Sequence, residues 1–305
     1  MNLTEKNKYK ADFKKELDKF ADKLEKYVST DKGDWTVKGF IDVYKNIYTI
    51  SSDTKIVSKI LEIHIFPQIL QFADSIGYKI ILAEKQNWYP DLTLVNKKNE
   101  KVKFAIDIKT TFRRNDKTAG FTLGSHGGYF KERDKSKNIQ FPYNQYTGHY
   151  CLGVIYTRTD MTEDLSEAEI YQVEDLQEEY ETPNKKVGQR KVTTVKHLKS
   201  ITSVIKDFDF FAAEKWKIAS DKQGSGNTAN IGSIVDIADL KNGNGIFSQL
   251  GEEWFDEYWI NHGSATMVKD GKAVKITTLK DFLEFKGKTN LWEKIVARTS
   301  KKKTK

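Results

Sequence analysis

The chain has 305 residues, of which 38% are hydrophobic and 12% aromatic, with 51 Lys and Arg against 43 Asp and Glu. This composition supports one large core or two small ones and excludes a disordered chain. The one cysteine, Cys151, cannot form an internal disulfide, which excludes a cross-linked secreted domain and favours a reducing cytoplasm. No apolar run reaches the roughly 18 residues of a membrane span, and no signal peptide is recognisable at the start. We therefore expect a cytoplasmic protein with no membrane contact.

The net charge of +8 is concentrated at one end of the chain. Residues 269–305 contain 12 basic and 4 acidic residues, whereas residues 161–182 contain 9 acidic residues and no basic one. Such runs are usually solvated surface, but clustered Lys and Arg also bind DNA without regard to its sequence. Composition therefore favours a nucleic-acid partner without establishing one. The last residues, 301–305, are expected to be a disordered solubilising end.

Hydrophobic spacing predicts the elements of the first 82 residues. Residues 3–28 carry apolar side chains three or four positions apart, which predicts an amphipathic helix that covers a sheet or a partner subunit. A second helix is expected to begin after the N-cap cluster Ser51-Ser52-Asp53 and to end at Pro67, with Glu62 off its apolar face. That apolar face is expected to consist of Ile56, Ile60 and Ile63. Residues 78–82 predict a strand.

Residues 92–95 and 102–109 predict an antiparallel hairpin. Alternating apolar residues in the second strand place Asp107 and Lys109 together on the opposite face. Pairing apolar residues in register sets Leu92 opposite Ile106. The same register sets Asp91 opposite Asp107.

Later segments give coarser predictions. Residues 149–156 and 216–219 read as buried strands, and residues 252–261 as an aromatic-rich helix. Residues 224–232 contain three glycines and two asparagines, which predicts a loop because these residues tolerate positive φ.

The opposed aspartates are the strongest chemical signal in the chain. Residues directly opposite on an antiparallel pair have Cβ atoms about 5 Å apart, so two carboxylates there repel each other unless a cation lies between them. Asp91 and Asp107 are therefore either a repulsion tolerated in solvent or a divalent metal site. Oxygen ligands alone favour Mg²⁺. Lys109 lies on the same face and could contact a phosphate or an attacking water, or form only a weak surface ion pair.

Pro90-Asp91 followed by Asp107-Ile-Lys109 resembles the PD-(D/E)xK nuclease signature. The surrounding sequence resembles the EcoRV-like type II restriction endonucleases of that superfamily. The resembling blocks, in chain order, are residues 52–55, 86–94, 105–111, 121–124, 137–139, 156–158, 224–228 and 230–233. The departures from the family pattern are Trp88, residues 126–128 and residues 160–182, and the sequence after His262 has no recognised counterpart.

The resemblance implies a role for each matched residue. Asp91 and Asp107 would hold Mg²⁺, Lys109 would orient or help to activate the attacking water, and Glu62 would be the auxiliary acid. Residues 224–228, here named the recognition segment, would read the outer base pairs of GATATC in the major groove, where an asparagine amide can pair with adenine. Without the resemblance, the same segment reads as a mobile surface turn. The implied DNA-contacting residues are Gly224, Ser225, Gly226, Asn227 and Thr228, with Gln86 and Asn87 in the minor groove and Thr110, Thr111, Thr122 and Lys137 at phosphates or base edges.

These observations predict an α/β protein with a central mixed β-sheet flanked by helices. Residues 1–50 are expected to form a helical dimerisation region, 51–262 a nuclease core and 263–305 a basic extension. The expected function is Mg²⁺-dependent cleavage of double-stranded DNA at GATATC to blunt, 5′-phosphorylated ends by a homodimer, since a palindrome calls for a two-fold symmetric reader. The alternatives are a repair or structure-specific nuclease, a DNA-binding protein without catalysis, and a scaffold protein that uses helix 3–28.

Overall fold

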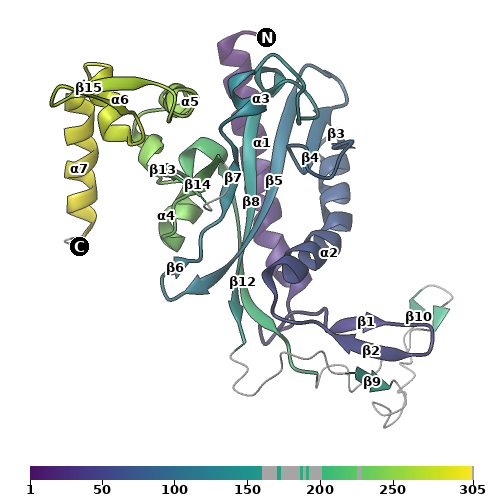
Figure 1. Ribbon diagram of the computed structural model, residues 1–305. Coiled ribbons are helices and arrows are strands. Elements are labelled where there is room, and N and C mark those ends of the chain that lie inside the picture. The colour runs from purple at the N-terminus through teal and green to yellow at the C-terminus, as the bar shows by residue number, and fades with distance from the viewer. Residues whose placement is uncertain (160–169, 173–185, 188–189, 192–200, 225–228, 304–305) are drawn as a thin grey trace. The chain divides into compact units, whose positions relative to one another are not determined.

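The computed structural model describes residues 1–305 except 160–169, 173–185, 188–189, 192–200, 225–228 and 304–305 (Figure 1). The fold is mixed α/β, with a central mixed sheet flanked by helices, which confirms the predicted class. The chain divides into two compact units. Unit 1 comprises Met1–Asp22, Gln68–Ile155 and Phe210–Lys305, and unit 2 comprises Lys23–Pro67 and Tyr156–Asp209. The predicted division into a dimerisation region, a core and an extension stays a prediction.

The described helices and strands have the following bounds. The helices are α1 (Leu3–Val28), α2 (Thr54–Ser75), α3 (Gly128–Lys131), α4 (Ile237–Asn242), α5 (Glu252–Asn261), α6 (Leu279–Phe285) and α7 (Thr289–Lys303). The strands are β1 (Gly39–Ile41), β2 (Asn46–Thr49), β3 (Tyr78–Leu82), β4 (Leu92–Asn96), β5 (Lys103–Arg114), β6 (Lys117–Thr118), β7 (Thr122–Ser125), β8 (Gly148–Arg158), β9 (Ile170–Gln172), β10 (Lys186–Val187), β11 (Arg190–Lys191), β12 (Ile205–Glu214), β13 (Ala219–Gln223), β14 (Asn230–Ser233), β15 (Thr266–Lys269) and β16 (Lys272–Lys275).

The central sheet has the strand order β12-β8-β5-β4-β3, with β6 paired to β5. β4 and β5 are antiparallel, and Leu92 faces Ile106 as the alternation of apolar residues predicts. The strand at 78–82 is confirmed as β3, and the strand at 149–156 is confirmed within the longer β8. Strand β12, which borders β8, was not predicted.

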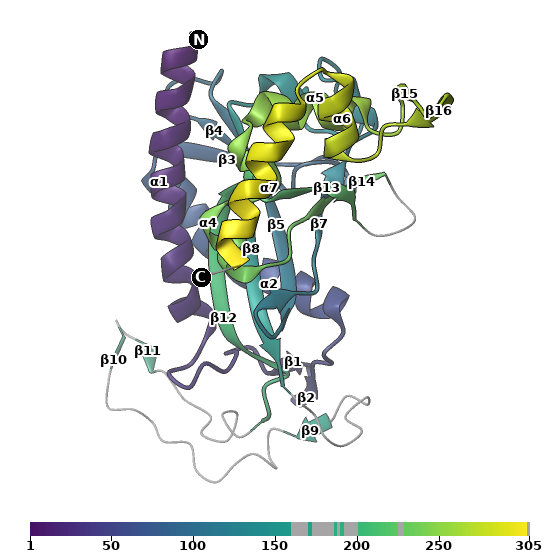
Figure 2. The same cartoon turned by 90° about the vertical axis from the view of Figure 1, so that its left-hand side faces the viewer.

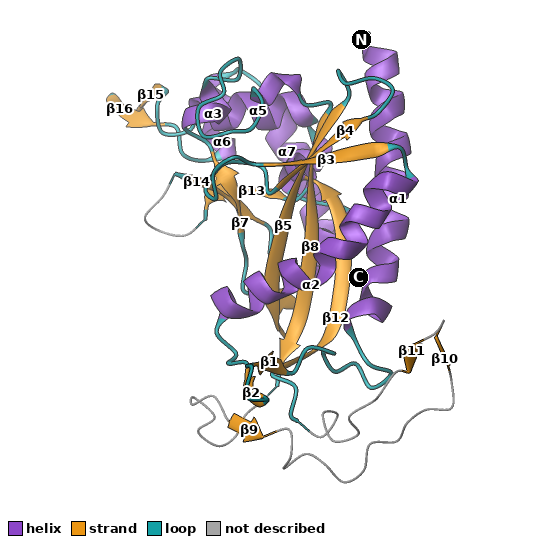
Figure 3. Cartoon of the chain, turned by 90° about the vertical axis from the view of Figure 1, so that its right-hand side faces the viewer, coloured by secondary structure: helices purple, strands orange, loops and turns teal. Residues whose placement is uncertain are grey.

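Helix α1 covers one face of this sheet through aromatic contacts (Figure 3). The ring of Phe13 stacks on that of Phe104 from β5, with 3.9 Å between centroids, and lies 5.3 Å from the ring of Tyr150 on β8. Phe13 also contacts Tyr78 on β3, at 5.6 Å. One helix face thus spans several strands of the sheet, as the amphipathic spacing of 3–28 predicts for a helix that covers a sheet.

A smaller sheet of order β13-β14-β7 lies in unit 1 with the C-terminal elements. The expected strand at 216–219 is wrong, because Lys215–Lys217 forms a 3₁₀ turn and the strand begins at Ala219. The expected loop at 224–232 is also too long, since its residues from Asn230 pair with β7 and β13 as β14. The helix at 252–261 is confirmed as α5.

The C-terminal residues fold and contribute to a hydrophobic core. Ile276, Leu279, Phe282 and Leu283 are fully buried in the same hydrophobic cluster as Tyr258 of α5. Helix α6 is followed by α7, and the two pack together (Figure 2). The expectation of a disordered end is wrong for residues 301–303, because α7 extends to Lys303.

Unit 2 is built around Trp35, which is fully buried and donates its indole N–H to His64 Nδ1 at 3.3 Å. It contains the small antiparallel sheet β1-β2-β9 and the first part of α2. The predicted end of α2 at Pro67 is wrong, since the helix continues to Ser75. Its predicted apolar face is wrong as well, because Ile56 and Ile63 are exposed. By length and composition α2 could cross a membrane, a weak indication that buried helices of soluble proteins also give.

Candidate active site

The hairpin β4-β5 brings together the three residues of the nuclease signature. Asp91 immediately precedes β4, while Asp107 and Lys109 lie two residues apart on β5. The backbone N–H of Ile108 donates to Asp91 Oδ2 at 2.7 Å, which ties the Asp91 carboxylate to the strand between the other two residues. Lys109 Nζ lies 2.9 Å from Asp107 Oδ2. The predicted triad is therefore one cluster in space.

The two carboxyl groups resist ionising together. Asp91 is exposed, yet surrounding protein atoms remove part of its hydration, and this raises its pKa above the usual range. The charge of Asp107 and a hydrogen bond between the two carboxyl groups raise the pKa further, while Lys109 opposes the shift. Burial alone would lower the pKa of Lys109, but the charges of Asp107 and Asp91 outweigh it and raise that pKa, so the ammonium stays protonated.

The donor set fits a hard divalent cation. Two adjacent carboxylates that repel each other gain most from a cation between them. Mg²⁺ typically takes one or two protein carboxylates and completes its shell with water and substrate phosphate. Within the described residues, no third His, Cys, Asp or Glu forms a metal-binding group with this pair, so such a site would leave coordination positions open for water and phosphate.

Glu62, the predicted auxiliary acid, lies on the part of α2 that belongs to unit 2. Its carboxylate pairs with Lys59 Nζ, one helical turn away, at 2.6 Å. Its role stays a prediction.

Aromatic rings from several elements form a layer behind the triad. Tyr89, two residues before Asp91, stacks on Tyr129 with 5.1 Å between ring centroids and shares a 3.0 Å hydrogen bond with His149 Nδ1. Asp107 is only 7% exposed, although it points away from the apolar side of its strand. The hairpin is therefore covered on both faces.

Lys215 is the site residue that the sequence did not reveal. Its side chain is buried, and Nζ lies 4.7 Å from the ring centroid of Tyr89 and 5.5 Å from those of Phe130 and Tyr143. Within the described part of the chain this Nζ has no hydrogen-bond partner. Burial lowers the pKa of Lys215 to about 7, against the opposing effect of the Asp107 charge. The local sequence Glu-Lys-Trp-Lys contains no signal for this burial, because it reads as charged surface.

The predicted DNA-contacting residues outside the recognition segment lie on different elements of unit 1. Gln86 and Asn87 are exposed in the turn between β3 and β4, and Lys137 is exposed in the connection after α3. Thr110 is partly exposed on β5, whereas Thr111 is buried and its hydroxyl donates to the carbonyl of Gly120 at 3.4 Å. These placements leave all but Thr111 accessible for DNA contact.

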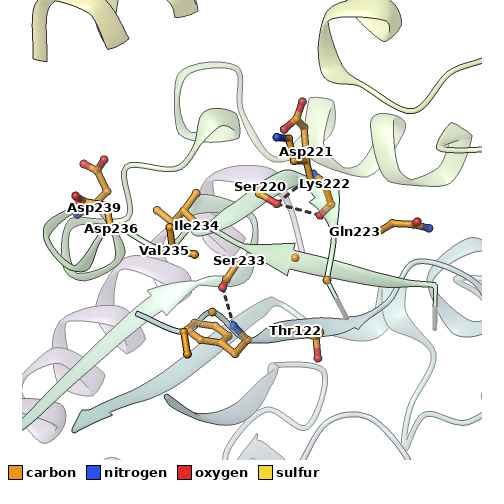
Figure 4. Close-up of a pocket in the computed structure, with 15 residues that line it drawn as sticks. Thr122, Ser220, Asp221, Lys222, Gln223, Ser233, Ile234, Val235, Asp236 and Asp239 are labelled. Atoms are coloured by element: carbon orange, nitrogen blue, oxygen red, sulfur yellow. Dashed lines mark hydrogen bonds between the residues drawn. The ribbon is translucent and has the colours of Figure 1, made fainter. Parts of the chain in front are cut away.

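The recognition segment begins at the edge of an open pocket of about 720 Å³ (Figure 4). Gly224 and Thr122 both line this pocket, together with residues of β13 and β14. A Cβ atom on Gly224 would lie 2.5 Å from Thr122 Cγ2, so the close approach of these strands requires glycine. The other segment residues, Ser225, Gly226, Asn227 and Thr228, lie outside the described residues.

Comparison with known proteins identifies the family of the chain. The family model described as restriction endonuclease EcoRV matches residues 31–182 and 179–287. The type II restriction enzyme EcoRV of Escherichia coli is 33% identical over 252 residues, which cover 82% of this chain and 91% of that protein. The chain belongs to the EcoRV family of type II restriction endonucleases, which are enzymes that hydrolyse DNA.

Proposed function

We propose that this endonuclease cuts both strands of DNA at the palindrome GATATC in the presence of Mg²⁺ and leaves blunt ends with 5′-phosphates. The observation that carries the proposal is the cluster of Asp91, Asp107 and Lys109 on adjacent strands, at the positions that match the family signature. The resemblance of the recognition segment to that of the EcoRV-like enzymes supports the choice of site.

In this proposal the carboxylates of Asp91 and Asp107 hold the metal, and Glu62 assists. Mg²⁺, when bound, lowers the pKa of a water molecule and offsets charge on the phosphate. The N–H of Ile108 keeps Asp91 oriented toward the site. The ammonium of Lys109, held beside Asp107, orients the attacking water and stabilises the negative charge that develops on the phosphate oxygens.

The proposed readers of the sequence are Gly224, Ser225, Gly226, Asn227 and Thr228 in the major groove. The glycines would let the backbone approach the base edges, and the Asn227 amide would pair with adenine. Gln86 and Asn87 would lie in the minor groove, and Thr110, Thr111, Thr122 and Lys137 at phosphates or base edges. Thr111 would have to exchange its bond to Gly120 for this contact.

A palindromic site also implies the assembly. Two identical half-sites related by a two-fold axis are read by two copies of one chain related by the same axis. We therefore propose a homodimer in the cytoplasm, with residues 1–50 contributing to the dimer interface.

The test is digestion of a supercoiled plasmid of known sequence with Mg²⁺, followed by sequencing of the ends. Breaks in the centre of GATATC support the proposal. Breaks at junctions or without sequence preference would instead indicate a structure-specific nuclease. Intact DNA, bound equally with or without the metal, would indicate a binding protein.

A matched pair of variants tests the site itself. Asp107→Asn removes one metal-binding charge at nearly constant volume, so we expect cleavage to fall by at least about 10³-fold with DNA binding retained. Asp74→Asn is the control, because Asp74 is an exposed aspartate paired with Lys97 outside the site. Equal cleavage by both variants would refute the metal assignment.

A further inference from the structure

His126 contacts the two residues that flank the recognition segment. The segment is bounded by Gln223, the last residue of β13, and by Ala229, just before β14. The backbone N–H of His126 donates to the carbonyl of Ala229 at 2.8 Å. The imidazole Nε2 lies 3.0 Å from the amide nitrogen of Gln223. One residue thus bonds to both ends of the segment.

The imidazole is held from behind by aromatic residues of the C-terminal part of the chain. Its ring centroid lies 5.0 Å from that of Trp259 on α5 and 5.1 Å from that of His262, which follows the same helix. His126 is 5% exposed, and its Nδ1 has no hydrogen-bond partner among the described residues. The contact with Gln223 is therefore the one side-chain hydrogen bond that the described residues give this imidazole.

The direction of that bond follows from its chemistry. An amide nitrogen can only donate, so Nε2 accepts and the ring proton resides on Nδ1. Burial lowers the pKa of His126 to about 4, with the neighbouring His262 contributing, and so the ring is neutral near pH 7 and keeps the lone pair that the bond needs.

Backbone pairing also holds the two sides of the segment, because Gln223 pairs with Ile231 in the register of β13 and β14. The imidazole bond adds a side-chain link from Gln223 toward β7. Strand β7, which ends just before His126, pairs with β14 through Ser125 and Asn230. On the β13 side, the N–H of Gly224 donates to the carbonyl of Asn230 at 2.9 Å. Among the described contacts, the imidazole therefore links the end of β13 directly to the residue that follows β7.

We propose that His126 is a positioning residue that fixes the spacing of Gln223 and Ala229 and thereby sets how strictly the enzyme discriminates the outer base pairs of its site. The inference rests on the proposed function of the recognition segment.

The experiment compares kcat/KM on three duplexes: the site mapped from the wild-type digestion, the same site altered at one outer base pair, and the site altered at one central base pair. His126→Phe keeps an aromatic ring against Trp259 but removes the acceptor, and we expect the preference over the outer alteration to fall about fivefold, the effect of one hydrogen bond. The preference over the central alteration should be unchanged.

Two further variants separate positioning from a general loss of structure. His126→Gln places an amide near the position of Nε2 and should restore the outer preference. Gln223→Met removes the donor of the same hydrogen bond. Because Gln223 is exposed, this variant tests the bond even if His126→Phe does not fold. The double variant should lose no more preference than either single variant.

The outcomes distinguish this inference from the proposed function. A wild-type enzyme with no site preference would refute the proposed function. A wild-type preference that His126→Phe and Gln223→Met leave intact would refute the inference alone. An equal loss against outer and central alterations, which His126→Gln does not restore, would assign His126 a purely structural role and also refute it.

Discussion

Replacing the buried lysine behind the active site should stabilise the protein, and by an amount that depends on pH. Burial lowers the pKa of Lys215 from 10.5 to about 7. The difference of about 3.5 units corresponds to at most about 5 kcal/mol at 1.36 kcal/mol per unit. Lys215→Met fills the same space without the charge, so near pH 6 the variant should exceed the wild type in free energy of unfolding by up to this amount.

The pH dependence supplies the sharper test. Between pH 7 and 10.5 the unfolded chain binds the Lys215 proton and the folded chain does not, so the stability of the wild type rises with pH. The advantage of Lys215→Met should therefore shrink by about 1.4 kcal/mol per pH unit over this range. Below pH 7 both states carry the proton, and the advantage should be constant.

Urea unfolding followed by tryptophan fluorescence, in EDTA at pH 6, 7, 8 and 9, measures this difference. Lys217→Met is the matched control, since Lys217 lies two residues away with a partly exposed side chain paired with Glu214. Its stability difference from the wild type should not follow the pH dependence expected for Lys215→Met. A Lys215→Met advantage that stays constant from pH 7 to 9, or a variant less stable throughout, would refute the account of Lys215 as a costly buried cation.

Three other changes test separate parts of the structure. Replacing Lys301, Lys302, Lys303 and Lys305 together by Gln should make the negative slope of log binding constant against log salt concentration shallower by up to about 4. Anisotropy titrations on cognate and altered duplexes should show the same site preference as the wild type. An unchanged slope would show that these residues do not contact DNA. Gly153→Ala should cost about 1–3 kcal/mol in urea unfolding, because its Cβ would lie 2.1 Å from the Phe211 ring, and wild-type stability would contradict this packing. Glu62→Gln should slow plasmid cleavage with DNA affinity retained. Glu100→Gln, at an exposed glutamate paired with Lys79, should leave the cleavage rate unchanged. Equal cleavage rates for the two variants would exclude Glu62 from the active site.

The hairpin could be predicted because its signal is local. Alternation in two short segments sets Leu92 opposite Ile106, and a slip of one residue would turn the apolar residues away from the core. Burial of the other face could not be predicted in this way. Asp107 is buried, and Tyr129 and Lys215, both distant in sequence, lie close enough for its charge to act on them. Sequence periodicity therefore gave the pairing of the triad but not its environment.

Helix α2 shows why a helix end and an apolar face can both be misread. Isoleucine or leucine recurs so often between Ile56 and Leu70 that several stripes fit, and the buried one runs through Val57, Leu61, Ile65 and Ile69. Proline removes one helical N–H, which normally pairs with the carbonyl four residues earlier. Here that residue, Ile63, is exposed, as is Pro67, so water can satisfy the freed carbonyl and the helix continues.

The charges of the triad connect its fold to its chemistry. With both carboxylates ionised and Lys109 protonated, the cluster carries a net charge of −1, which opposes the approach of a DNA phosphate. A divalent cation changes that net charge to +1, which is equal and opposite to the charge of one phosphodiester. The hairpin fixes this imbalance, because its register brings Asp91 beside Asp107. In the proposed function, the repulsion between the aspartates is therefore a structural cost that becomes an affinity for metal and phosphate together.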